Sequence, residues 1–278
     1  MSDRYAVVGN PIAHSLSPQI HTAFAAQTGE DIHYDKLLAE KGAFAEFARD
    51  FFATGGRGLN VTVPFKLDAC ELADRLTERA SAAGAVNTLK LQADGSLLGD
   101  NTDGAGLVAD IRDNLGWPIA GQRVLLLGAG GAARGALLPL LAERPALLTI
   151  ANRTAARALD LATEFAGLGG QDCPLGGGGY ETLVGHFDLV INASAASLGG
   201  EVPPLPEDLF AAGGRAYDMV YGAEPTPFMR WAQARGAEVA DGLGMLVGQA
   251  AEAFSLWRGV RPDVAPVLAA LRTRLAEK

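Results

Sequence analysis

Polar side chains that could bind a small molecule or move a proton occur in four short strings of the N-terminal part of the chain. The strings are NPIAHSLSP, NVTVPFK, AVNT and DNTDG, and they supply Ser15, Ser17, Asn60, Thr62, Lys66, Asn87 and Asp103. Each string falls at an expected strand end or helix start, where polar groups from several strands can converge on one crevice. Singly, each residue also has an ordinary role: Ser17 can cap a helix, and Lys66 can be a solvated lysine. Together they indicate a candidate site whose ligand they leave open.

A glycine-rich loop between an apolar run and a helical pattern is the second chemical signal. Residues 123 to 136 read RVLLLGAGGAARGA, with Gly128, Gly130 and Gly131 directly after the apolar run. Such glycines permit a tight turn and let a pyrophosphate reach a helix N-terminus, where unpaired amides favour anions. Ala133 stands where the GxGxxG pattern usually has its third glycine, a recorded variant. The loop predicts a dinucleotide site, although an ordinary strand-to-helix turn also uses glycines.

The residues after the next apolar run distinguish between the two nicotinamide dinucleotides. An NAD site usually has a carboxylate about 20 residues after the loop, for the ribose hydroxyls. Here the chain has Asn152, Arg153 and Thr154, with Arg157 one turn later. Two guanidinium groups suit a 2′-phosphate through charge-assisted hydrogen bonds, so the sequence predicts NADP. A solvated helix start with Thr154 as its N-cap is the alternative.

Alternating strands and helices must position these residues. Between residues 5 and 64 the hydrophobic pattern reads β, α, β, α, β. It predicts a helix over 18–28, with Ser17 as N-cap, Pro18 at the first helical position and Gly29 as the stop. The string NTLKLQADGSLLGDNTD predicts a hairpin that turns at Asp94-Gly95.

The pattern changes near Gly116, before Trp117-Pro118, which is a candidate linker. After it, strands alternate with helices, which implies a parallel sheet with right-handed crossovers. The glycine run 176–179 is expected to be a flexible loop, and EVPPLPEDL a proline-rich surface connection. Helices are expected from residue 242 to the C-terminus.

Composition limits the kinds of partner. The chain has 278 residues, a formal net charge of −9 and only two cysteines, Cys70 and Cys173. An acidic chain is a poor match for nucleic acid, which binds clustered lysine and arginine. Two cysteines are too few for a disulfide scaffold or a zinc cluster, so no metal is expected. The chain shows neither a signal peptide nor an apolar stretch of about 20 residues, which predicts a cytoplasmic protein without membrane contact. For the oligomeric state, a monomer and a homodimer are both expected possibilities.

The strings together resemble the shikimate dehydrogenase family. NPIxHSxSPxxH, NVTxPxK, GAxNT, GDNTDG, GAGGAxRG, NRT, YDMxY and DGLGMLxxQA occur in this order, from roughly residue 5 to residue 255. The resemblance implies an α/β fold with an N-terminal substrate domain, residues 1–104, which the C-terminal helices 242–278 complete. A Rossmann-type, doubly wound NADP domain would comprise residues 105–241. The implied reaction is the reversible reduction of 3-dehydroshikimate to shikimate by NADPH, in aromatic amino acid (chorismate) biosynthesis.

The resemblance also implies roles for individual residues. Lys66 and Asp103 would form the catalytic pair, and Ser15 and Ser17 would bind the substrate carboxylate. The other substrate-binding residues would be Asn60, Thr62, Asn87, Tyr221 and Gln249. The cofactor-binding residues would be Gly128, Ala129, Gly130, Gly131, Ala132, Asn152, Arg153, Thr154, Arg157, Ser194, Met219 and Gly242. For Met219, simple core packing is an equally ordinary explanation.

Some residues depart from the family pattern. After FDLVIN the family often has Ala-Thr, whereas this chain has Ala193-Ser194. Because Ser194 keeps a hydroxyl, we expect little effect on contacts to the nicotinamide ribose. A quinate or mixed quinate/shikimate dehydrogenase that uses NAD(P) is the alternative, since few pocket residues separate these enzymes. A binding protein without turnover is disfavoured, because it would not need Lys66 together with Asp103.

Overall fold

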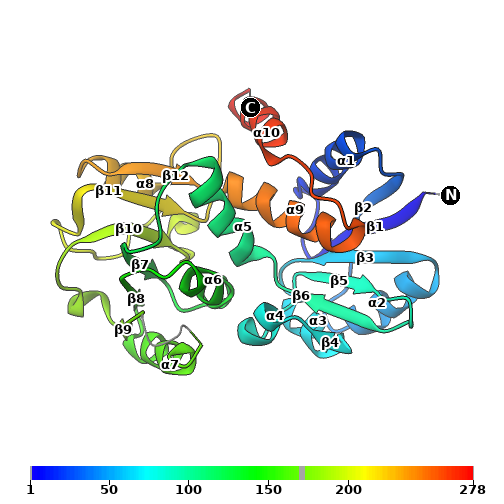
Figure 1. Ribbon diagram of the computed structural model, residues 1–278, viewed down its shortest axis with the longest axis horizontal. Coiled ribbons are helices and arrows are strands. Elements are labelled where there is room, and N and C mark those ends of the chain that lie inside the picture. The colour runs from blue at the N-terminus through cyan, green and yellow to red at the C-terminus, as the bar shows by residue number, and fades with distance from the viewer. Residues whose placement is uncertain (1, 169–172, 278) are drawn as a thin grey trace. The chain divides into compact units, whose positions relative to one another are not determined.

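A computed structural model describes residues 2–168 and 173–277, which divide into two compact units. The first unit comprises Met1–Gly106 and Val247–Ala270, and the second comprises Leu107–Leu246 and Leu271–Lys278. Each unit is built on its own six-stranded sheet (Figure 1).

The first unit has a mixed sheet with the strand order β2-β1-β3-β5-β6-β4. Its strands are β1 (Asp3–Gly9), β2 (Ile32–Leu38), β3 (Gly56–Val61), β4 (Arg75–Leu76), β5 (Thr88–Leu91) and β6 (Leu97–Asp100). Strands β2, β1 and β3 are parallel, while β5 runs antiparallel to both β3 and β6. The hairpin β5–β6 turns at Gly95, whose φ of 86° suits glycine, so the predicted hairpin is confirmed.

Helices cover both faces of this sheet. They are α1 (Ser17–Thr28), α2 (Phe44–Ala53), α3 (Lys66–Leu72), α4 (Glu78–Ala83) and part of α9 (Leu243–Arg258). Because side chains alternate along a strand, Ala6 and Val8 of β1 pack among residues of α2, α3 and α4, whereas Tyr5 and Val7 pack against Trp257 of α9. Helices therefore cover both faces of the sheet (Figure 1). The polar residues at its strand ends are attached to strands that pack on both sides.

The second unit has an all-parallel sheet with the strand order β12-β11-β10-β7-β8-β9. Its strands are β7 (Arg123–Leu127), β8 (Leu147–Ala151), β9 (Leu175–Gly178), β10 (Phe187–Asn192), β11 (Phe210–Asp218) and β12 (Glu238–Asp241). This is the doubly wound Rossmann order, which reverses between β7 and β10. Ligands bind such sheets beyond the carboxyl ends of the strands at that switch point.

The helices of the second unit connect its strands or flank them. They are α6 (Gly131–Ala142), α7 (Ala155–Phe165) and α8 (Pro227–Gln233), together with the last part of α10 (Val264–Ala276), whose residues up to Ala270 belong to the first unit. Helix α5 (Asp103–Ala109) begins in the first unit and continues into a π-helical turn, Asp110–Asn114. Leu115 and Gly116 follow this turn, and Gly116 has a φ of 66°, so the helical segment ends where the change of pattern was expected.

Two local predictions are wrong. Ser17 is not the N-cap of α1, because the helix already includes it and the cap position is Leu16, which makes no side-chain capping bond. The glycine run is not a loop, since Leu175–Gly178 forms strand β9, which pairs in parallel with β8. A Cβ on Gly177 would lie 2.3 Å from the Ala158 carbonyl oxygen of α7. Glycine is therefore required where α7 packs directly on this edge strand.

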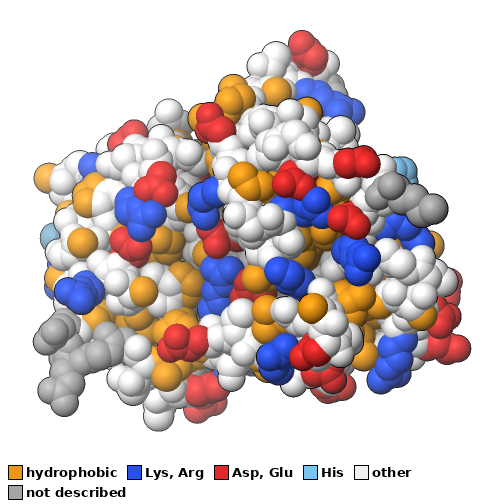
Figure 2. All heavy atoms as spheres, turned by 45° about the vertical axis from the view of Figure 1, so that its right-hand side comes forward, with side chains coloured by type: hydrophobic (Ala, Val, Ile, Leu, Met, Phe, Trp, Pro, Cys, Tyr) orange, Lys and Arg blue, Asp and Glu red, His pale blue; other side chains and the backbone are white. Residues whose placement is uncertain are grey.

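Charges of both signs are mixed on the face that Figure 2 displays, where lysine and arginine side chains alternate with aspartate and glutamate. Among the described residues, no helix has the length and apolar character needed to cross a membrane. The described residues also contain no cluster of three or more histidine, cysteine or acidic side chains that could hold a metal ion.

Candidate functional site

Lys66 and Asp103 form an ion pair in the first unit. Lys66 begins α3 directly after the NVTVPF turn, and Asp103 begins α5 directly after the hairpin. The Lys66 Nζ lies 2.5 Å from Asp103 Oδ2, and the two side chains keep 30% and 17% of their surface exposed. The pair is thus close enough to share a proton and open enough to meet a ligand.

Asn87 joins this pair to Gln249. Its Nδ2 donates to Asp103 Oδ1 at 2.8 Å and lies 3.5 Å from Gln249 Oε1. Its Oδ1 accepts the backbone N–H of Thr102 at 2.9 Å. Because a backbone N–H can only donate, this last contact fixes which end of the amide faces Asp103.

Asn60 lies near the end of β3, and Thr62 is the first residue after this strand. Asn60 is buried, and its Oδ1 accepts a hydrogen bond of 2.6 Å from the Tyr34 hydroxyl. Thr62 is half-buried beside the end of β1, where a Cβ on Gly9 would lie only 2.5 Å from its Cγ2. Both residues therefore lie at the carboxyl end of the β1–β3 pair.

Ser15 and Ser17 lie together just before and at the start of α1. The Ser15 hydroxyl donates to Ser17 Oγ at 3.2 Å, and its oxygen accepts the Ser17 N–H at 3.3 Å. Ser17 is buried, so its hydroxyl is fixed by its surroundings.

Asp100 anchors the turn that presents Asp103. It is almost fully buried, and Arg79 Nε, Thr77 Oγ1 and the Asn101 N–H all donate to its carboxylate. Burial alone would raise the pKa of Asp100, but the hydrogen bonds and charge of Arg79 hold it below the ordinary value. The turn is thereby fixed by an ionised carboxylate.

A cavity of about 690 Å³ opens in the second unit beyond the carboxyl ends of its strands. Its lining includes the glycine loop, the residues after β8, and the residues after β10. The predicted residues in this lining are Gly128, Ala129, Gly130, Gly131, Ala132, Asn152, Arg153, Arg157 and Ser194.

The walls of this cavity fit NADP. Gly128 has a φ of 105°, and a Cβ there would come within 3.2 Å of the Ala193 carbonyl, so a side chain would fill the cradle. Helix α6 begins at Gly131 with its amides at the loop, which suits a pyrophosphate. Arg153 and Arg157 are exposed on the cavity wall and supply two positive charges.

The loop after β10 is held by a buried carboxylate. Asp218 is fully buried and accepts hydrogen bonds from Ser197 Oγ and Thr226 Oγ1, each at 2.6 Å. The Ser194 hydroxyl donates to Asn192 Oδ1 at 2.7 Å and so turns toward the end of β10.

Three predicted cofactor residues lie outside the lining of this cavity: Thr154, Met219 and Gly242. Thr154 is at the N-cap of α7, although its side chain makes no capping bond. Met219 and Gly242 lie together, because a Cβ on Gly242 would be 2.1 Å from the Met219 carbonyl oxygen. Tyr221 also belongs to the second unit, where burial and the nearby charge of Asp241 raise its pKa.

The sequence interpretation missed several lining residues. Tyr180 lines the cavity from a 3-10 turn after β9, and no local motif marks it. The segment 201–204, expected to be only a surface connection, lines the cavity as well. In the first unit, Tyr34, Thr88 and Thr102 bond the predicted residues, and their strand positions alone gave no sign of this.

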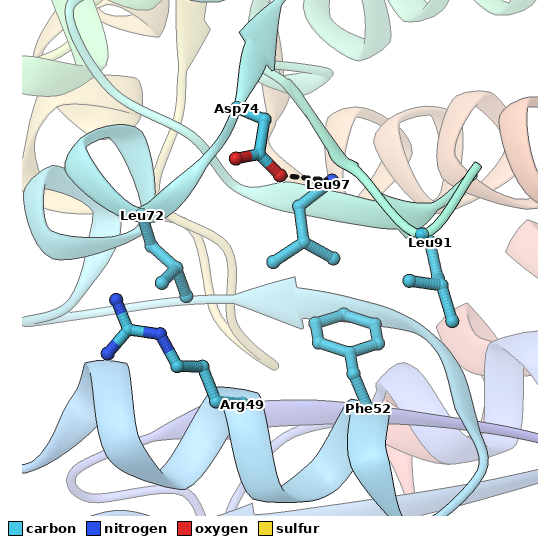
Figure 3. Close-up of a pocket in the computed structure, with 7 residues that line it drawn as sticks. Arg49, Phe52, Leu72, Asp74, Leu91 and Leu97 are labelled. Atoms are coloured by element: carbon cyan, nitrogen blue, oxygen red, sulfur yellow. Dashed lines mark hydrogen bonds between the residues drawn. The ribbon is translucent and has the colours of Figure 1, made fainter.

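A further cavity, of about 270 Å³, lies in the first unit away from these residues (Figure 3). Leucine and phenylalanine side chains form much of its wall, with Arg49 and Asp74 at its edge. Asp74 Oδ2 already accepts the Leu97 N–H at 2.7 Å, as the dashed line in Figure 3 marks. We assign no ligand to it.

Known proteins match this chain along nearly its whole length. Residues 7–89 match the shikimate dehydrogenase substrate binding domain, residues 111–198 match shikimate / quinate 5-dehydrogenase, and residues 242–272 match the shikimate 5′-dehydrogenase C-terminal domain. The shikimate dehydrogenase (NADP(+)) of Cupriavidus taiwanensis is 61% identical over 99% of this chain and 95% of its own length.

Two solved structures are also similar. An Ael1 enzyme from Pseudomonas putida has a TM-score of 0.92 and 48% identity, over 97% of this chain and 98% of its own. Shikimate 5-dehydrogenase from Thermus thermophilus, in complex with NADP(H) and shikimate, has a TM-score of 0.83 and 34% identity, over 98% and 99% of the two chains.

Proposed function

The chain belongs to the shikimate dehydrogenase family, and we propose that it catalyses the reversible, NADP-dependent interconversion of shikimate and 3-dehydroshikimate. It is an oxidoreductase of aromatic amino acid biosynthesis. Relatives near 60% identity are named for shikimate and NADP(+), so shikimate is favoured over the quinate alternative.

The Lys66–Asp103 ion pair is the observation that supports this function most directly. When a carbonyl is reduced, negative charge develops on its oxygen and must be met by a proton or a nearby cation. Bound NADPH supplies the hydride for the carbonyl carbon. Lys66 supplies both a positive charge and a proton for the oxygen, and in the reverse direction takes that proton back.

Asp103 and Asn87 keep this proton donor in position. The Asp103 carboxylate holds the Lys66 ammonium through Oδ2, and Asn87 holds Asp103 through Oδ1. Gln249 lies against Asn87 and Thr102 and offers its amide to substrate hydroxyls.

Hydroxyl and amide groups bind the rest of the substrate in this proposal. Ser15 and Ser17 bind the carboxylate, Asn60 and Thr62 line the carboxyl end of β3, and Tyr221 is a further substrate-binding residue. Residues 1–104 with 242–278 act as the substrate domain, and residues 105–241 as the NADP domain. The protein is proposed to be cytoplasmic, as a monomer or homodimer.

The cofactor residues divide into three groups in this proposal. The glycine loop with Ala129 and Ala132 receives the pyrophosphate, while Asn152, Arg153, Thr154 and Arg157 receive the adenosine 2′-phosphate. Ser194, Met219 and Gly242 serve the nicotinamide half.

Oxidation of shikimate, followed by the absorbance of the reduced cofactor, tests the function. The purified protein is mixed with NADP or NAD and with shikimate, quinate or no acid. Reduction of NADP that depends on shikimate and far exceeds the rate with quinate is the expected result. Equal rates with quinate, or no reduction with either acid, would contradict the proposal.

A further inference from the structure

A line of hydrogen bonds runs through the first unit from Tyr34 to the catalytic pair. The Tyr34 hydroxyl contacts Asn60 Oδ1 at 2.6 Å, Asn60 Nδ2 contacts Thr88 Oγ1 at 3.1 Å, and Thr88 Oγ1 contacts Asn87 Oδ1 at 2.9 Å. Asn87 Nδ2 then contacts Asp103 Oδ1 at 2.8 Å. Five residues on four elements are thus linked, and we call this line the Tyr34 chain.

Which atom donates in each hydrogen bond of the Tyr34 chain follows from the contacts at its Asn87–Asp103 end. Because the Thr102 N–H donates to Asn87 Oδ1, the Asn87 NH₂ must face Asp103. Since Asn87 Oδ1 is an acceptor, the Thr88 hydroxyl donates its one proton to it and cannot donate to Asn60. Asn60 Nδ2 therefore donates to Thr88 Oγ1, and it also donates to the Asn87 backbone carbonyl at 3.4 Å.

Asn60 therefore turns its carbonyl oxygen toward Tyr34, whose hydroxyl must be the donor. All donors point toward Asp103, and hydrogen bonds aligned in this way strengthen one another in a low-dielectric interior.

The chain is buried and firmly supported. Tyr34 is 7% exposed, and Thr88 is fully buried. The Tyr34 ring stacks on His21, with ring centroids 4.3 Å apart and an interplanar angle of 8°, and it also packs near Trp257. A misdirected amide in such a place would leave buried polar atoms without hydrogen-bond partners, which is unfavourable.

Burial raises the Tyr34 pKa well above its ordinary value, and the influence of the Ser17 side chain offsets this only in part. Tyr34 therefore stays protonated and remains a donor to Asn60. Ser17 in turn accepts from Ser15.

We propose that Tyr34 and Thr88 are positioning residues, which set the Asn87 amide against Asp103 and so help to hold the Lys66–Asp103 pair in place. This inference rests on the proposed function. Neither residue needs to touch the substrate. Their effect passes through Asn87, whose NH₂ is held toward the catalytic carboxylate.

The first test needs no substrate. The side-chain amide signals of Asn60 and Asn87 are recorded by ¹H–¹⁵N NMR and assigned by their loss in Asn60→Asp and Asn87→Asp. Tyr34→Phe keeps the ring and removes the hydroxyl, so it should shift both signals.

Tyr5→Phe is the matched control for this test. Tyr5 packs against the same Trp257, with ring centroids 4.7 Å apart, but its hydroxyl accepts from Arg258 and lies outside the Tyr34 chain. If Tyr34→Phe leaves the Asn87 signal where Tyr5→Phe leaves it, the proposal is wrong, whatever the enzyme acts on.

The second test is kinetic. Tyr34→Phe and Thr88→Val should lower kcat for shikimate about three- to tenfold, a loss of roughly one hydrogen bond, with the KM for NADP unchanged. The solvent isotope effect on kcat should rise, because the proton donor is less well placed. Thr88→Ser keeps the hydroxyl and should restore kcat.

The two proposals fail in different ways. A wild-type protein that does not oxidise shikimate would overturn the proposed function, while the amide signals would still decide the Tyr34 chain. An active wild type in which Tyr34→Phe and Thr88→Val match Tyr5→Phe in kcat and isotope effect would overturn the chain alone.

Discussion

The Ser15 side chain contacts Ser17 twice, through a hydroxyl–hydroxyl bond of 3.2 Å and a bond of 3.3 Å from the Ser17 N–H. The second bond turns the backbone into the start of α1, so the two hydroxyls lie side by side. No capping bond from Ser17 supports the helix. Replacing these serines should therefore affect ligand binding more than helix stability.

The double variant Ser15→Ala/Ser17→Ala should raise the KM for shikimate at least about tenfold, because two neutral donors to a carboxylate are lost. The Kd for NADP should not change. Thr28→Ala removes a hydroxyl from the same helix, bonded to Phe24 O, and is the control. Equal losses of shikimate and NADP affinity would contradict the assignment.

Arg153→Ala should weaken NADP more than NAD. One charge-assisted contact to the 2′-phosphate is worth about 1.5–3 kcal/mol, so the KM for NADP should rise at least about tenfold while that for NAD stays nearly constant. Arg230→Ala, at an exposed position on α8 outside the cavity lining, is the control. A wild type that uses both cofactors equally well would refute the specificity argument.

Gly177 and Gly176 offer a direct test of strand β9. A Cβ on Gly177 would lie 2.3 Å from the Ala158 carbonyl oxygen, whereas one on Gly176 would meet nothing within 4 Å. Gly177→Ala should lower the free energy of unfolding by about 1–3 kcal/mol, the usual cost of overpacking. Gly176→Ala should change it little. Similar unfolding curves for the two variants would mean that α7 does not pack on this strand.

His21 should make the protein less stable in mild acid. Burial lowers its pKa from 6.5 to about 3, so between these pH values the unfolded chain binds a proton that the folded protein does not. The contribution of neutral His21 to the free energy of unfolding is fully present above pH 6.5. It decreases as the pH falls, by about 2 kcal/mol at pH 5.

Urea unfolding at pH 7 and pH 5 measures this loss. In His21→Phe the difference between the two pH values should shrink by about that amount, whereas the exposed His33→Gln should behave as wild type. An unchanged difference in His21→Phe would contradict the buried, neutral state of His21.

The fold could be predicted where local patterns and tertiary packing agree. The hairpin at Asp94-Gly95 has its own turn signal, and the loop Gly128–Gly131 carries a fixed spacing, so both were recognised. Strand β9 could not be, because glycines have no hydrophobic period. It is a strand only because β8 offers it hydrogen bonds and α7 leaves no room for side chains.

The candidate site, like the fold, could be predicted from the sequence only in part. Motifs predicted the residues with functional groups at strand ends, such as Lys66 and Asp103, which the structure brings together. Tyr34 and Thr88 occupy ordinary strand positions, and only the sheet order β2-β1-β3-β5 brings their hydroxyls to Asn60. Ser17 satisfied the sequence rule for a helix cap, but its place within α1 beside Ser15 gives its hydroxyl other partners.

Steady-state kinetics of Lys66→Ala test the central claim, that Lys66 with Asp103 handles the proton at the reacting oxygen. The account predicts that kcat falls about a hundredfold or more, the usual contribution of a positioned acid, with a much smaller change in the KM for shikimate. Asp103→Ala should also lower kcat, since it leaves the ammonium without its 2.5 Å partner. A turnover near that of the wild type in Lys66→Ala would contradict the account.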